Sequence, residues 1–377
     1  MPFDRTAFSD KIRRSKEHLA VEDAEIIAET GIAESRLTAL MSGSVDPSGD
    51  EVLILADFFD CDYKFFISHE RLAAFEETDS LYRKHGEQFS KADRRSVQQF
   101  LYLCECESWL WEITNKRFQS FDFAPKGSND KANGAKAALD LRSRLNYDAG
   151  QVPSDIFRDF RLLGIHIFRR KLTNSNISGV MIRHPRAGNC VLVNYDEDVY
   201  RQRFTAAHEL AHAIMEDTAV NLSMGNDGSN LVEVRANAFA SHYLLPPEFL
   251  TNIASGVAAW IPSVLIEWAA RLRVSTSMLR IALKERGIIS VRQFDELKGV
   301  SVPRDQKIDP ELANQTGRTR ERKLALLERG LSFHYVGECV ETLRAGQISR
   351  GRAAEMLLVS ESELYEIEQL FSMSEVK

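Results

Sequence analysis

The stretch RFTAAHELAHAIM, Arg203 to Met215, decides how the rest of the chain is interpreted. It places His208 and His212 four residues apart, and at about 100° per residue two such side chains lie on one face of a helix and can share a cation. Glu209 is the next residue of the same helix, about 100° round its axis from His208, where it can take a proton from a water molecule at that cation. The neighbouring residues are mostly alanine, leucine and isoleucine, which predict a buried helix. Because buried ionisable groups are costly without partners, the pattern indicates a metal site.

A third ligand is expected, because a catalytic zinc commonly has three protein ligands and one open position. Glu233 fits this role. It opens the segment EVRANAFASHYLLPP, whose apolar residues predict a second buried helix that ends at Pro246 and Pro247. The intervening DTAVNLSMGNDGSN is rich in turn residues, so we expect a loop that brings this helix back against the first.

Two other polar residues lie on the second helix. Asn237, one turn beyond Glu233, is a candidate to orient the ligands by hydrogen bonding, or equally a packed polar residue. His242 lies about half-way round the helix from Glu233, so it is not expected to bind the metal.

The two segments together resemble the ImmA/IrrE metallopeptidases, whose pattern is an arginine-phenylalanine-threonine lead, HExxH, then E-x-x-A-N-x-F-A and a proline-terminated helix. The resemblance extends to helices and strands upstream and covers about residues 135–287. It implies an α+β, predominantly helical fold, with a zincin-like metallopeptidase core around a small β-sheet. It also implies zinc ligation by His208, His212 and Glu233, and general acid/base work by Glu209.

The function that this resemblance implies is that of a zinc-dependent endopeptidase. A divalent metal would polarise the carbonyl and acidify a water molecule, and Glu209 would carry the proton to the leaving amine, with no covalent intermediate. Zinc is favoured by two imidazoles and a carboxylate, although manganese or iron fits the same donors. The family is associated with cleaving repressors, so we expect a protein substrate, a transcriptional repressor or another regulator, in a stress, phage-defence or mobile-element response.

The strands expected at 177–183 and 190–194 precede the metal helix. One of them could be an exposed edge to which an extended substrate adds as a further strand, or an edge with a structural role only.

Composition sets the outer frame. The chain has 377 residues, 44% of them hydrophobic, enough for two or three domains with cores. No stretch approaches the ~20 apolar residues of a membrane span, and the charged start MPFDRTAFSDKIRR lacks a signal core, so we expect a cytoplasmic protein with no membrane partner. Five scattered cysteines favour reduced thiols. Cys104 and Cys106 are expected to be buried as small hydrophobes.

Residues 1–68 are interpreted as an XRE-like helix-turn-helix domain. Short helices are expected over 8–18, 21–30, 33–41 and 50–59. The run IIAETGIAESRLTALMSG resembles the two central helices of XRE/Cro-type regulators, in which the second helix enters the major groove. That resemblance implies DNA contacts by Ser35, Arg36 and Thr38, next to Glu34.

The charge of this unit argues against simple DNA binding. It carries fourteen acidic and seven basic residues, a net charge of −7, whereas phosphate neutralisation supplies most of the affinity for DNA. DNA binding and a dimerisation or protein-docking role, including a homodimer, therefore both stay open. The alternative function is a DNA-binding transcriptional regulator that uses the metallopeptidase fold as a sensor or scaffold without proteolysis. An intact Glu209 favours the peptidase, because a scaffold needs no general base.

Three further units follow. Residues 69–134 are expected to form a helical bridge and linker, with a long helix at 92–116 that packs Trp109 and Trp111 into a neighbouring domain, and a Pro/Gly/Asn-rich linker at 124–134. Residues 135–290 form the metallopeptidase domain. Residues 291–377 form a polar connector and a small helical C-terminal domain, whose arginines at 344, 350 and 352 allow a second nucleic-acid contact, although an interaction role is favoured.

Overall fold

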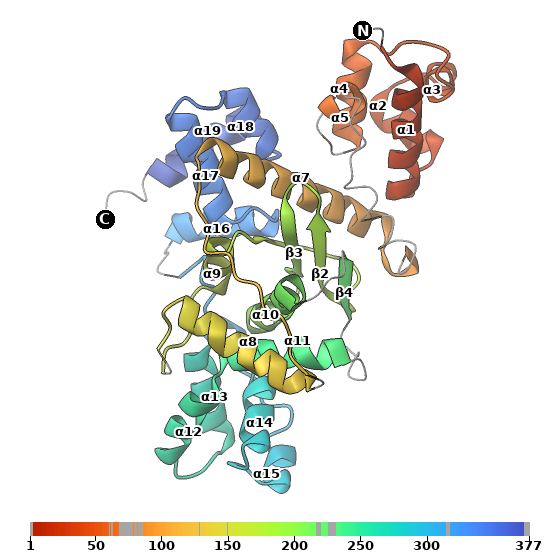
Figure 1. The fold of residues 1–377 in the computed structure, drawn as a ribbon. Helices are drawn as coiled ribbons and strands as arrows, with labels where there is room; N and C mark the ends of the chain where they lie inside the picture. Colours follow the sequence, from red (N-terminus) through yellow and green to blue (C-terminus); the bar gives the residue numbers. More distant parts are fainter. Residues whose placement is uncertain are drawn as a thin grey trace.

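The computed structural model describes residues 3–59, 61, 63–67, 78, 81, 86–127, 129–148, 150–215, 220–224, 231–313 and 317–372. Helices dominate, and they surround one four-stranded sheet (Figure 1). The expected α+β, predominantly helical class is therefore confirmed.

The N-terminal unit is a group of short helices with its own apolar core. These are α1 (Arg5–Leu19), α2 (Asp23–Thr30), α3 (Glu34–Met41), α4 (Gly49–Phe58) and α5 (Tyr63–Ile67). Gly31 ends α2 in the left-handed region at φ 69°, as a glycine stop should. The four expected helices are all present, and the XRE-type assignment stays a prediction.

This unit meets the long helix α7 (Lys91–Ile113) through polar contacts. Lys91 Nζ lies 2.5 Å from Glu25 Oε1, and Arg95 lies 4.0 Å from Glu29. Arg94 donates a hydrogen bond of 2.9 Å to the carbonyl of His18. Part of the acidic surplus noted in the sequence therefore faces the basic start of α7.

The sheet has the strand order β1-β3-β2-β4. Its strands are β1 (His166–Arg170), β2 (Ile177–His184), β3 (Gly188–Asn194) and β4 (Val220–Met224). β1 is parallel to β3, and β2 is antiparallel to both β3 and β4. The expectation that β2 or β3 is an edge is wrong, because both have a neighbour on each side. The loop expected between the two metal helices is also corrected: it contains β4, which pairs with β2 and forms one edge.

Helices cover both faces of the sheet (Figure 1). One face packs on α10 (Val199–Met215), with α8 (Asp130–Arg144), α9 (Ile156–Leu162) and α11 (Leu231–Leu244) around it. The other face packs on α7 and on the C-terminal α16 (Gly317–Glu328), α17 (Phe333–Arg344), α18 (Arg350–Met356) and α19 (Glu361–Ser372). Alternation along β3 sends Val191 and Val193 to the first core, and Cys190 and Leu192 to the second.

The C-terminal helices α16 to α19 therefore share an apolar core with α7 and the sheet, whereas Leu297 and Val302 pack in the core around α10. The boundary expected at residue 291 stays a prediction. Trp109 packs against this core, and Trp111 is buried and stacks on His166 at a centroid distance of 4.0 Å. Cys104 and Cys106 are buried in it, and the five cysteines, all among the described residues, are not joined by disulfides. None of the helices in the described part is long and apolar enough to cross a membrane.

The linker expected at 124–134 is partly wrong, because α8 begins inside it at Asp130. The Asn129 side chain caps this helix by accepting a hydrogen bond of 3.0 Å from the Ala132 amide. Gly134 then allows the close packing of α8 on α11, since a Cβ atom there would lie 2.1 Å from the carbonyl oxygen of Arg235. Gly134, which the sequence suggests is part of a linker, is therefore a point of close contact between α8 and α11.

Further helices extend from the end of the metallopeptidase region. They are α12 (Pro247–Ser255), α13 (Pro262–Leu272), α14 (Thr276–Glu285) and α15 (Val291–Glu296), with the 3-10 turns η1 (Gly86–Gln88) and η2 (Arg304–Gln306) elsewhere.

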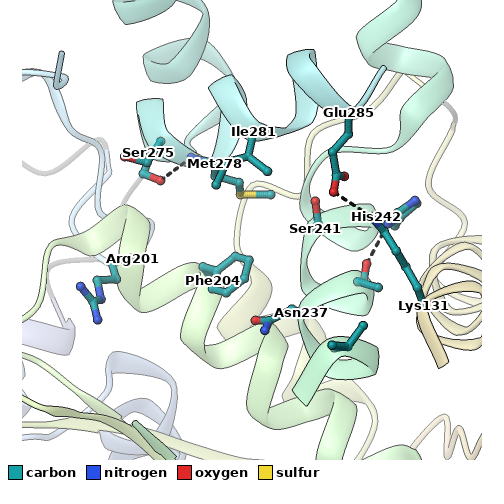
Figure 2. Close-up of a pocket in the computed structure, with 13 residues that line it drawn as sticks. Lys131, Arg201, Phe204, Asn237, Ser241, His242, Ser275, Met278, Ile281 and Glu285 are labelled. Carbon is teal, nitrogen blue, oxygen red and sulfur yellow. Dashed lines mark hydrogen bonds and ion pairs between the residues drawn. The ribbon is translucent and has the colours of Figure 1, made fainter. Parts of the chain in front are cut away.

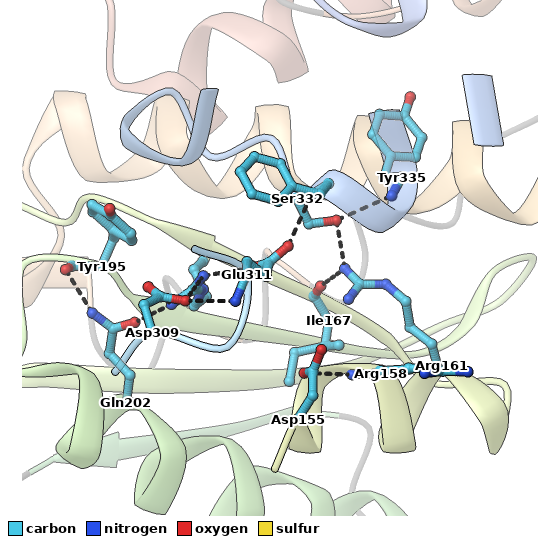
Figure 3. Close-up of polar contacts among 12 residues, drawn as sticks. Asp155, Arg158, Arg161, Ile167, Tyr195, Gln202, Asp309, Glu311, Ser332 and Tyr335 are labelled. Atoms are coloured by element: carbon cyan, nitrogen blue, oxygen red, sulfur yellow. Dashed lines mark hydrogen bonds and ion pairs between the residues drawn. The ribbon is translucent and has the colours of Figure 1, made fainter. Parts of the chain in front are cut away.

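A buried arginine of β1 holds the connector after α15 to the sheet. Figure 3 shows the connector residues Asp309 and Glu311 close to Gln202 of α10. Arg169 of β1 lies 2.7 Å from Asp309 and 2.5 Å from Glu311, and it donates to Gln202 of α10 at 3.0 Å. Burial alone would lower the pKa of Arg169, but the two carboxylates raise it. Glu311 also accepts a hydrogen bond of 2.8 Å from the Phe333 amide at the start of α17. The connector therefore joins the C-terminal helices to β1 and to the first turn of α10, the helix that carries the metal motif.

Candidate metal centre

Two helices supply the three predicted ligand side chains. His208 and His212 lie one turn apart on α10, and Glu233 lies in the first turn of α11. His208 Nε2 is 3.1 Å from His212 Nε2 and 3.0 Å from Glu233 Oε2. His212 Nε2 is 3.4 Å from Glu233 Oε1. The structure thus brings the three donor groups to one point.

These separations match a small tetrahedral cation. Zinc bonds of about 2.0–2.1 Å at tetrahedral angles keep neighbouring ligand atoms about 3.3 Å apart. All three side chains are buried, and the Nε2 atoms of both imidazoles point at the same place. Two nitrogens and one carboxylate oxygen are also a donor set that zinc favours, so the residues present fit this metal.

The protonation tendencies agree with such a role. Burial alone would raise the pKa of Glu233, but hydrogen bonds and charge from His208 and His212 hold it well below the usual range. Burial alone would lower the pKa of His208, but the Glu233 hydrogen bond and the charge of Glu209 raise it. Glu233 is therefore an anion that stabilises positive charge at the position between the imidazoles.

Asn237 lies beside the first ligand. Its Oδ1 atom is 3.0 Å from His208 Nδ1 and can accept a hydrogen bond from the protonated Nδ1. The Nε2 lone pair is then directed at the metal position. His242 lies outside the ligand group, and its Nδ1 donates to the carbonyl of Ala238 at 2.8 Å.

Glu209 is fully buried and packs against the sheet at Gly179 of β2. A Cβ atom at residue 179 would lie 2.8 Å from Glu209 Oε1 and 2.6 Å from Thr205 Cγ2. Only glycine permits this approach of α10 to β2. Reasoning from sequence missed Gly179, although a glycine within an apolar strand is a signal of close backbone approach.

Arg203, which opens the metal motif, holds α10 in place. It is fully buried and donates hydrogen bonds to the carbonyls of Arg273 and Ser154, both at 3.1 Å, and of Pro153 at 2.5 Å. Burial lowers the pKa of Arg203 to about 10. Carbonyls from two loops therefore fix the start of the helix whose later turns carry the ligands.

The predicted DNA-contacting residues lie on α3, in the separate N-terminal unit. Arg36 donates to Glu51 through Nε at 2.7 Å and Nη2 at 2.8 Å. The hydroxyl of Thr38 donates to the carbonyl of Glu34, and Ser35 is exposed. Arg36 would have to leave Glu51 to reach a base, and DNA contact by these residues stays a prediction.

The arginines near the C-terminus also have acidic neighbours. Arg350 and Arg352 lie 2.7 Å from Glu368 and Glu355, respectively. A nucleic-acid role for them stays a prediction.

A second group of possible ligands, Glu107, His334 and Glu338, lies between α7 and α17. Its carboxylates are already engaged by basic side chains. Arg161 Nε is 3.1 Å and His166 Nδ1 2.6 Å from the oxygens of Glu107, and Lys116 contacts Glu338. This arrangement suits a buried ion-pair network better than a metal site.

Comparison with known families agrees with the geometry. Residues 161–284 match the peptidase M78 family model, described as the IrrE N-terminal-like domain. This segment includes both metal helices, the three donor residues and Glu209. The match supports a metallopeptidase of the ImmA/IrrE family. A search of curated proteins gave no match to the chain.

Proposed function

We propose that this protein is a zinc-dependent endopeptidase that cleaves a transcriptional repressor or another regulatory protein. The observation that carries the proposal is the convergence of His208, His212 and Glu233 at ligand-to-ligand spacing, with Glu209 buried at the next position of the same helix.

His208, His212 and Glu233 would hold the zinc ion, which when bound supplies Lewis acidity toward a carbonyl and a water molecule. Glu209 accepts the proton of the attacking water and passes it to the leaving amine. Asn237 keeps His208 in the tautomer that offers Nε2. Gly179 and Thr205 fix the position of the Glu209 side chain.

An extended substrate would pair with the sheet edge at β4. This strand has β2 on one side, and the sheet ends on the other. Main-chain hydrogen bonds to such an edge bind a peptide with little dependence on its side chains.

The test combines metal content with cleavage. Wild type and Glu209→Gln should each carry one zinc per chain by elemental analysis, and His212→Ala should lose it. His242→Ala is the matched control for metal content, because His242 lies outside the ligand group. The wild type should cleave candidate repressors encoded near its gene, with products identified by mass spectrometry, whereas Glu209→Gln and His212→Ala should not.

Two results would overturn the proposal. A full equivalent of zinc in His212→Ala would refute the ligand assignment. A zinc-loaded wild type that shifts promoter DNA but cuts none of the repressors would favour the alternative, a regulator that uses the fold as a sensor or scaffold.

A further inference from the structure

A pocket of about 460 Å³ lies between α10, α11 and α14, with Phe204 of α10, Asn237 of α11 and Met278 of α14 around it (Figure 2). This volume lies within the range of pockets that bind small organic groups. Its apolar wall consists of Phe204, Val234, Ala238, Met278 and Ile281.

The pocket lies next to the metal centre, because two of its lining residues contact or approach His208. Phe204 lies one helical turn before His208, and their ring centroids are 6.3 Å apart. Asn237 lies one turn after Glu233, lines the pocket, and contacts His208 Nδ1 at 3.0 Å. Since a helical turn is about 5.4 Å long, both residues place the pocket about one turn from the ligand residues along the two helices.

The charged groups of the pocket are paired with one another or with near neighbours. Lys131 Nζ lies 2.7 Å from Glu285, and Arg201 Nε lies 2.8 Å from Glu197. These pairs leave little net charge to select an acidic or basic partner.

The remaining titratable group in the wall is a histidine. Burial lowers the pKa of His242, so its ring is neutral at pH 7. The pocket also presents apolar surface to solvent, because the Ile281 side chain is 48% exposed. The chemistry of the pocket therefore suits an apolar group.

We propose that this pocket binds a large apolar side chain of the substrate, of the leucine, methionine or phenylalanine kind, next to the scissile bond. The proposal rests on the proposed peptidase function and adds a preference to it. An apolar side chain would displace water from Phe204, Met278 and Ile281, while the peptide bond beside it lies at the metal position.

The test uses two hydroxamates, which bind a metal through the same head group and differ in their tails. Acetohydroxamate carries a methyl group, and 4-phenylbutanohydroxamate carries a tail long enough to enter the pocket. Titration calorimetry on the zinc-loaded full chain should show that the second binds at least about tenfold more tightly.

Two variants separate the pocket from general effects. Ile281→Asp places a charge in the apolar wall and should reduce the preference to less than about threefold, with acetohydroxamate affinity unchanged. Leu139→Asp is the matched control, because Leu139 is a helical residue of similar exposure, 45%, on α8 outside the pocket. It should keep the full preference.

The outcomes distinguish the two proposals. If neither hydroxamate binds the zinc-loaded protein, or if zinc does not bind, the metal assignment fails and the pocket assignment fails with it. If acetohydroxamate binds and the longer compound binds no more tightly, the pocket assignment alone is refuted. A preference that survives Ile281→Asp unchanged would also refute it.

Discussion

Replacing Gly179 with alanine should slow peptide cleavage while leaving the metal in place. The new methyl group would lie 2.8 Å from Glu209 Oε1 and 2.6 Å from Thr205 Cγ2, whereas ordinary contacts begin at 3.4 Å. The carboxylate must therefore move by at least about 0.6 Å, or α10 must move away from β2. The atoms nearest to the new methyl group belong to Thr205 and Glu209 and not to the three ligand residues, so we expect the metal to stay bound.

The size of the effect follows from this displacement. A misplacement of about 1 Å in a catalytic site can cost on the order of 10²-fold in rate. We expect kcat to fall by about 10–100-fold with KM little changed, since Glu209 acts in the transition state. Overpacking should also cost about 1–3 kcal/mol of stability.

The assay measures kcat, KM, zinc content and thermal unfolding on the same preparations. Gly256→Ala is the matched control, because a Cβ atom there meets only the Ile253 carbonyl oxygen at 3.6 Å, an ordinary contact. A folded, zinc-loaded Gly179→Ala protein with kcat within twofold of wild type would refute the role given to the position of Glu209. Thermal unfolding tests the packing independently of any substrate.

Two further predictions concern charged contacts away from the centre. Arg36 lowers the pKa of Glu51 to about 2 from 4.5, so this pair stabilises the folded state above about pH 4.5 and loses its effect as pH falls toward 2. Because the Arg36 side chain is 37% exposed, Glu51→Gln should lower the free energy of unfolding by only about 0.5–1 kcal/mol at pH 7, and by less at pH 3. An equal loss of thermal stability at the two pH values would contradict this. Asp309→Ala should cost about 3 kcal/mol in urea unfolding, because it removes one carboxylate from the buried Arg169; a loss below 1 kcal/mol, or one no larger than that of the exposed Asp305→Ala, would refute it.

Local spacing is enough to predict much of the candidate centre. His208 and His212 share a helical face by periodicity alone, and Glu233 needs only one reversal of the chain to reach them. The apolar pattern of each segment predicts its helix, and turn residues predict the reversal. The positions of the helices in the N-terminal unit follow from the same kind of signal.

Features that depend on distant pairing could not be predicted in this way. The segment 220–224 is a strand because it pairs with β2, about 40 residues earlier, and its own short sequence resembles a loop. The strand order decides which strand is an edge, and periodicity does not encode that order. Arg169 and Asp309 are 140 residues apart in the chain, and Gly179 matters only because α10 crosses it.

The junction at the start of α7 has a mechanical consequence. The ion pairs of Lys91 with Glu25 and of Arg95 with Glu29 lie at the surface. The N-terminal unit and the part that contains α7 are each held by their own apolar core. The Debye length falls from about 8 Å at physiological ionic strength to about 3 Å at 1 M salt, so salt near 1 M weakens these close pairs and leaves apolar cores intact. High salt should therefore loosen the contact between the N-terminal unit and α7, and small-angle scattering at rising salt should record a larger radius of gyration with both cores unchanged.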